Sequence, residues 1–132
     1  MAITNATIAL SSDLIDGGIN VSNMATLNTA GTDTGMNTLA SVTKTLSSTN
    51  QVDLITTASA STTHAYVYIN NPSTDDSKFF KITIGAHNGA DVEEIGRLYA
   101  GDFMWFPWDV DDDITCIPSS ADDMTIEYMV FS

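Results

Sequence analysis

Histidine and cysteine, which often supply acid–base and nucleophilic chemistry near neutral pH, are few in this sequence, and they lie apart along it. The chain contains two histidines, His64 and His87, and one cysteine, Cys116. Neither histidine stands at a spacing typical of a Ser-His-Asp triad or a metal site. Cys116 lies between Thr115 and Ile117 in a strand-like run, which favours a buried structural thiol. We therefore expect a non-enzymatic protein without an intrachain disulfide or a cysteine-based zinc cluster.

Carboxylates are the most abundant groups with binding chemistry. They crowd one predicted turn, which holds Asp109, Asp111, Asp112 and Asp113. Clusters of carboxylate oxygens suit Ca²⁺, but the glycine and the distal glutamate of an EF-hand loop are missing here. Other acidic residues also lie in or beside turns, which favours solvated loop charge. Binding of Ca²⁺ at this turn is the alternative, and no other cofactor is expected.

The aromatic residues are concentrated in segment 98–109, LYAGDFMWFPWD. It contains both tryptophans and two of the five phenylalanines of the chain. The segment reads as two short strands joined by a turn at residues 100–102. The apolar residues of the second strand alternate between two faces, with Phe103 and Trp105 on one face and Met104, Phe106 and Trp108 on the other.

Both faces of this second strand are apolar, so each of them needs a cover. One face can enter the core, and the other then meets a second layer, a neighbouring subunit or a ligand. The candidate interface residues are Phe103, Trp105, Phe106, Trp108, Tyr66 and Tyr68. The alternative is a central strand that is buried on both faces within its own domain.

Arg97 is the sole arginine and precedes the aromatic strand. In so acidic a chain we expect it to have a carboxylate partner, either Asp102 or Glu94. The default interpretation is that Arg97 forms a structural ion pair with this carboxylate. The more specific interpretation is that Arg97 anchors an interface with a partner.

Length and charge limit the classes of partner. The chain has 132 residues, enough for one domain with a real core, and 17 acidic residues against 4 basic ones, for a net charge of −13. Such a charge disfavours nucleic acids and anionic membranes, and it suits a basic protein partner or a salty medium that screens the repulsion. No signal peptide and no apolar run long enough to span a bilayer is visible.

The pattern from residue 41 onward predicts an all-β domain. Eight short strands with period-two alternation are separated by turn residues, and almost no helical period is present. The expected strands are Val42–Leu46, Gln51–Thr57, His64–Asn70, Lys78–Ile84, Val92–Tyr99, Asp102–Trp108, Ile114–Ile117 and Met124–Phe131. We therefore expect residues 41–132 to form an antiparallel β-sandwich, with a jelly roll as the form that eight strands favour.

Residues 1–40 differ in character from the rest of the chain. They hold no aromatic residue, and Ser, Thr, Asn and Gly recur throughout. This composition fits an extended N-terminal arm that becomes ordered against a partner, or a loosely packed segment of the same domain. A short strand within Ile3–Leu10 and a weak helix near Thr34–Ala40 are the elements that we expect here.

Two stretches carry a resemblance to a known family: AYVYINNPSTDDSKFFKITIG and IGRLYAGDFMWFPWDVDDDITCIPSSADDMTIEYMVF. They resemble small virion structural proteins of marine tailed bacteriophages, and the resemblance covers roughly residues 41–132. It implies a location in the virion, after assembly in the host cytoplasm. It also implies a capsid-associated role, as a decoration, cement or fibre-base protein.

The expected function is therefore that of a cement protein on the outer surface of a phage head. It would join neighbouring capsid subunits through its N-terminal arm, residues 1–40, and through the aromatic hairpin of residues 98–109. The partner would be the major capsid protein or another virion protein. By analogy with cement proteins, a homo-trimer or homo-dimer is expected. Two alternatives are a tail or head-fibre-base module that binds host glycans or another virion protein, and a small hydrolase on a jelly-roll scaffold.

Overall fold

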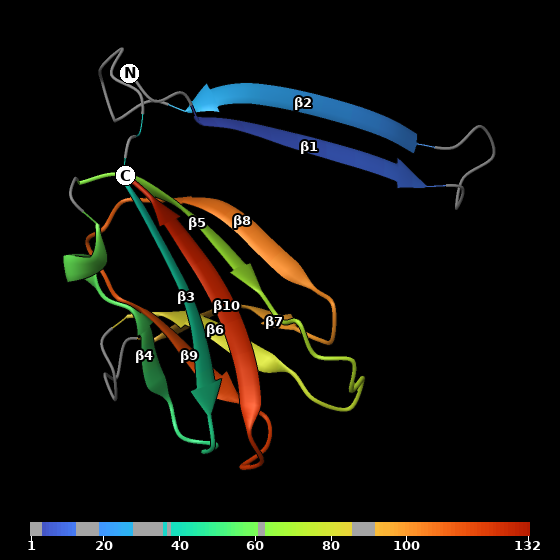
Figure 1. The fold of residues 1–132 in the computed structure, drawn as a ribbon, viewed down its shortest axis with the longest axis vertical. Coiled ribbons are helices and arrows are strands. Elements are labelled where there is room, and N and C mark those ends of the chain that lie inside the picture. Colours follow the sequence, from blue (N-terminus) through green and yellow to red (C-terminus); the bar gives the residue numbers. More distant parts are fainter. Residues whose placement is uncertain (1–3, 13–18, 28–35, 37, 61–62, 86–91) are drawn as a thin grey trace. The chain divides into compact units, whose positions relative to one another are not determined.

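The computed structural model describes residues 4–12, 19–27, 36, 38–60, 63–85 and 92–132. By their internal contacts, the residues of the chain form two compact units, 1–37 and 38–132. Among the described residues, no helix is long and apolar enough to cross a membrane. The strands are β1 Thr4–Ser12, β2 Ile19–Leu27, β3 Leu39–Leu46, β4 Val52–Ile55, β5 Ala65–Asn70, β6 Phe80–Ile84, β7 Glu93–Leu98, β8 Phe103–Trp108, β9 Ile114–Pro118 and β10 Met124–Phe131, with a 3₁₀ turn at Thr57–Ser59 (Figure 1).

The first unit is an antiparallel hairpin of β1 and β2. The register runs without interruption from Thr4 opposite Leu27 to Ser12 opposite Ile19. Neither strand contains a charged residue, in contrast to the acidic remainder of the chain. An isolated two-stranded hairpin is marginally stable in water.

The second unit is a β-sandwich of two four-stranded antiparallel sheets. One sheet has the strand order β3-β10-β5-β8 and the other has the order β4-β9-β6-β7. Each strand of the first half of the domain pairs with one of the second half: β3 with β10, β4 with β9, β5 with β8, and β6 with β7. A long antiparallel ribbon rolled into two sheets in this way is a jelly roll.

The prediction of an eight-stranded β-sandwich is confirmed, since each expected strand overlaps one of β3 to β10. The N-terminal strand expected within Ile3–Leu10 is present as β1, whereas β2 was not expected. The weak helix near Thr34–Ala40 is wrong where the structure describes it, because Leu39 and Ala40 begin β3. Along the chain, the boundary between the two units falls between residues 37 and 38, three residues before the predicted boundary.

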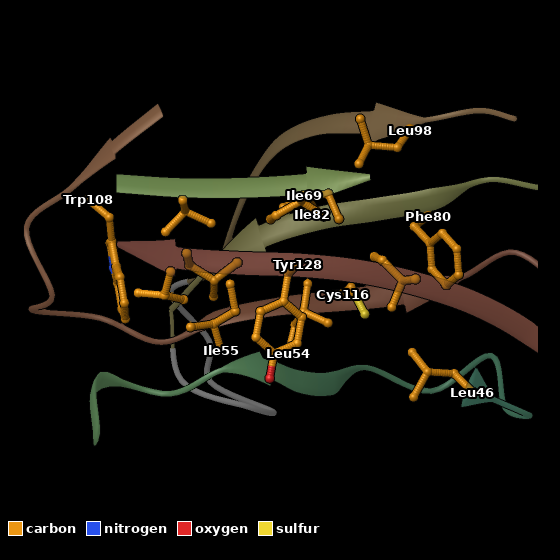
Figure 2. Packing of buried hydrophobic residues seen from close by; sticks show 14 of the residues in the cluster. Leu46, Leu54, Ile55, Ile69, Phe80, Ile82, Leu98, Trp108, Cys116 and Tyr128 are labelled. Carbon is orange, nitrogen blue, oxygen red and sulfur yellow. The ribbon is translucent and has the colours of Figure 1, made fainter. Parts of the chain in front are cut away.

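The core lies between the two sheets and follows the period of the strands. In β5 the residues Ala65, Val67 and Ile69 are fully buried, while the residues between them are only half-buried. Figure 2 shows the residues of both sheets interdigitating, from Trp108 at one end to Phe80 at the other. Burying one such large apolar side chain contributes roughly 1.5–3 kcal/mol, so the inner faces supply most of the stability.

The turn between β7 and β8 positions β8, the strand that carries both tryptophans. Gly101 adopts φ +80°, a left-handed conformation that glycine accepts without strain. The N–H of Gly101 donates to the backbone oxygen of Asn71 at 2.9 Å, and the Nδ2 of Asn71 donates to the backbone oxygen of Leu98 at 3.0 Å. The Oδ2 of Asp102 accepts the N–H of Tyr99 at 3.0 Å. The end of β5 and the start of β8 are therefore tied together by the buried Asn71.

Candidate functional site

The outward side of the β3-β10-β5-β8 sheet carries most of the exposed aromatic surface that the sequence predicted. Directly paired strand residues share one side of a sheet, so the registers define rows that run across all four strands. We call this side the aromatic face. Its first row is Leu39, Phe131, Tyr66 and Pro107, its second is Ser41, Met129, Tyr68 and Trp105, and its third is Thr43, Glu127, Asn70 and Phe103.

Trp105 lies at the centre of the ring contacts on the aromatic face. Its ring stacks on Tyr66 at a centroid distance of 5.6 Å and an interplanar angle of 15°, and it meets Phe131 edge-on at 5.6 Å. A second pair, Tyr68 and Phe103, lies at 6.0 Å. Such contacts between rings contribute about 0.5–1.5 kcal/mol each beyond burial, so the rings hold one another in place.

The aromatic face remains accessible to solvent. Phe103 is 65% exposed, Leu39 is 56% exposed and Met129 is 36% exposed. Tyr66 and Trp105 are half-buried by their neighbours. Single exposed apolar residues are common on protein surfaces, but here apolar residues lie side by side across four strands, which makes the aromatic face a candidate interaction surface.

The opposite side of β8 belongs to the core. Trp108 is 3% exposed, and its indole Nε1 donates to the backbone oxygen of Asp112 at 2.9 Å. Phe106 and Met104 pack against the same core cluster. The alternation predicted for the strand is therefore observed: of the candidate interface residues, Trp108 is buried in the core and Phe106 is partly buried against it, both on the side of β8 opposite to the aromatic face.

Arg97 lies on β7, in the other sheet. Its Nε donates to Oε1 of Glu94 at 3.0 Å, and its guanidinium lies 5.2 Å from the centroid of the Phe79 ring. The hydrogen bond to Glu94 raises the pKa of the guanidinium further. Glu94, rather than Asp102, is thus the carboxylate partner, and Arg97 is not part of the aromatic face.

The acidic turn does not gather its carboxylates around one point. The Oδ1 of Asp113 accepts the N–H of Thr57 at 2.7 Å, and the Oδ1 of Asp109 accepts the N–H of Asp111 at 3.3 Å. Within the part of the chain that the structure describes, no group of three or more His, Cys, Asp or Glu side chains could hold a metal ion. The predicted Ca²⁺ ligands, Asp112 included, are therefore not brought together as a site.

Of the histidines and the cysteine, the structure describes His64, which precedes β5, and Cys116, which lies on β9 in the other sheet. The ring of His64 meets the edge of Tyr66 at 5.1 Å, at the margin of the aromatic face. His87 lies outside the described residues. Cys116 is completely buried, and its burial raises the pKa of the thiol to about 12. A thiol with that pKa stays protonated at neutral pH and is a poor nucleophile.

Comparisons with known proteins add one solved structure. The sequence matches no protein-family model and no curated protein. The chain is similar in structure to the Yersinia pseudotuberculosis-derived mitogen, at 15% sequence identity and a TM-score of 0.43. The similarity covers 71% of this chain and 85% of the mitogen.

Several residues of the aromatic face were absent from the sequence-based candidates. Met129 and Phe131 lie on the outward side of β10, and Leu39 lies beside Phe131 on β3. Alternation in the predicted last strand could have separated Met129 and Phe131 from the buried Ile126. The sequence pattern alone does not say that β10 lies beside β5, so their meeting with Tyr66 could not be predicted.

Proposed function

We propose that this chain is a non-enzymatic structural protein of a phage virion that attaches to another virion protein through its aromatic face. The observation that carries the proposal is the exposed, ring-ordered patch around Trp105 on the outward side of one sheet. Aromatic residues that lie fixed at the centre of a surface patch are the usual hot spots of protein interfaces. The resemblance of residues 41–132 to small phage virion proteins supplies the virion context.

The proposed action is that of a cement or decoration protein on the head. The aromatic face would cover an apolar patch of the major capsid protein, and residues 1–37 would extend the contact to a neighbouring subunit. The two strands of the hairpin contain no charged residue, which supports that role, because they can lie against another protein without desolvating a charged side chain. The expected dimer or trimer of this chain is part of the same proposal.

Co-sedimentation with phage heads assembled without this protein tests the proposal. Wild type is expected to bind saturably and to raise the melting temperature of the heads. Trp105→Ala is expected to weaken binding about 30-fold, since truncation of an interface hot spot costs about 2 kcal/mol or more. Tyr99→Ala is the matched control, because Tyr99 is an exposed aromatic residue next to β7 in the other sheet.

The outcomes separate the proposal from its competitors. Binding without stabilisation of the heads indicates a fibre base rather than a cement. Equal binding by wild type and Trp105→Ala refutes attachment through the aromatic face. Failure to bind heads, combined with Trp105-dependent binding to a screened neutral oligosaccharide, indicates a glycan-binding module instead.

A further inference from the structure

The aromatic face contains no basic residue. The chain has four basic residues in total, all within the described part of the chain, and none occupies an outward position on this sheet. Each is engaged elsewhere: the Nζ of Lys44 donates to the backbone oxygen of Asp53 at 2.8 Å, Lys78 lies 3.3 Å from Asp122 and 3.7 Å from Asp75, and Lys81 and Arg97 lie 3.9 Å and 3.0 Å from Glu94.

Carboxylates, in contrast, stand on the aromatic face and beside it. Glu127 occupies its third row, where the Nδ2 of Asn70 donates to Oε2 of the carboxylate at 3.1 Å. Asp102 and Asp109 are exposed and lie directly before and directly after β8. The aromatic face is thus mainly apolar over its first two rows, with Ser41 as an exception, and it carries carboxylates at its margin, where His64 also lies.

We infer that the aromatic face receives a different protein, whose contact surface is apolar at the centre and carries arginine or lysine at its rim. The inference rests on the proposed function and names the chemistry of the partner. Two copies of this chain meeting through the same face would bring carboxylates near carboxylates, with a net charge of −13 on each copy. A dimer or trimer of this chain is therefore expected to use another surface.

Glu127 is the expected contact for one cation of the partner. Its neighbour across the strands is Asn70, and Tyr68 lies two residues earlier on the same side of β5. A guanidinium group can donate two hydrogen bonds to a carboxylate while its plane lies on an aromatic ring. Arginine fits this combination better than lysine, because its planar group serves both contacts at once.

The dependence of head binding on salt tests the inference. The dissociation constant of wild type is expected to rise steeply between about 20 mM and about 500 mM NaCl, because salt screens the opposite charges of the two rims. Glu127→Gln should weaken binding about fivefold at low salt and flatten the salt dependence. The variant amide oxygen can still accept the hydrogen bond from Asn70, so the fold of the sheet is preserved.

Glu93→Gln is the matched control, because it removes one exposed carboxylate from β7 in the other sheet. It should leave both the affinity and the salt dependence unchanged. Sedimentation velocity of wild type alone provides a second measurement, with no association through the aromatic face expected at low salt. A dimer at low salt that Trp105→Ala abolishes would overturn the inference.

The two proposals fail in different ways. If Trp105→Ala weakens binding but neither salt nor Glu127→Gln changes the affinity, the inference of a basic partner is refuted and attachment through the aromatic face still holds. If Trp105→Ala leaves the affinity unchanged, attachment through the aromatic face is itself refuted. A steep salt dependence that Glu127→Gln and Glu93→Gln reduce equally shows a general charge effect and also overturns the assignment to Glu127.

Discussion

Trp105 and Trp108 show how one strand divides its residues between two roles. They are three positions apart on β8, so they point to opposite sides of the sheet. Trp108 fills the core and hydrogen-bonds to the acidic turn, whereas Trp105 stacks on Tyr66 at the surface. The same residue type therefore lies in the core at one position and on the aromatic face at the other.

Substitution of the two tryptophans is expected to have unequal effects on stability. Trp108→Ala should lower the free energy of unfolding by about 3–5 kcal/mol, because it leaves a cavity in the core. Trp105→Ala should lower it by about 1–3 kcal/mol, since two ring contacts of about 0.5–1.5 kcal/mol each are lost and no cavity forms in the core. Urea unfolding followed by far-UV circular dichroism measures both values. Equal losses would contradict the assignment of Trp105 to the surface.

The buried thiol of Cys116 should make the free energy of unfolding depend on pH in the alkaline range. Its pKa is about 12 in the folded chain, against about 8.5 in an unfolded one. The unfolded state therefore releases this proton first, and the stability that the buried thiol contributes is lost as pH rises from about 8.5 towards 12. Between about pH 7.5 and about pH 10.5, wild type should lose about 2–3 kcal/mol more than Cys116→Ala does. Parallel pH profiles of the two proteins would show that the thiol is not buried.

At the scale of the strands, local pattern was sufficient to find the elements of the sandwich. Alternating apolar residues placed all eight strands, and turn residues such as those at 71–77 and 100–102 marked the breaks between them. β2 was not recognised, because its polar residues hide the alternation of the apolar ones. Which strands pair with each other could not be predicted for a different reason. β3 and β10 pair although about 80 residues separate them, and no local sequence signal encodes that contact.

The part of the candidate site that the sequence could predict is which residues share one side of each strand, because side chains alternate along a strand. Tyr66, Tyr68, Phe103 and Trp105 were expected to need a cover, and the structure puts them on one sheet side. Which apolar face of β8 enters the core could not be decided from the sequence, because both faces are equally apolar. The choice depends on which residues β5 and β10 present beside it.

The β7–β8 turn offers a test of the support beneath the aromatic face. Gly101→Ala should destabilise the chain by about 1 kcal/mol or more, because an alanine at φ +80° is strained. Gly96→Ala is the control, since a Cβ there would meet the Cε of Met104 at 3.5 Å, an ordinary contact. Thermal unfolding of both variants measures the difference. A larger loss for Gly96→Ala would contradict the turn conformation.

At the scale of the whole molecule, the jelly roll explains how distant segments form one surface. The aromatic face draws on β3, β5, β8 and β10, which span most of residues 39–131. All four basic residues are engaged away from it, and Glu127, Asp102 and Asp109 lie on it or beside it. The fold therefore gathers exposed apolar side chains on one face of a strongly acidic domain.

The central claim is that the aromatic face is covered in the assembled particle. Hydroxyl-radical footprinting with mass spectrometry tests it most directly, by comparing the free protein with the protein bound to heads. Phe103, Trp105 and Met129 should lose most of their reactivity on binding, while the exposed Tyr99 beside β7 keeps its reactivity. Unchanged modification of these three residues, with protection of Tyr99 instead, would contradict the account.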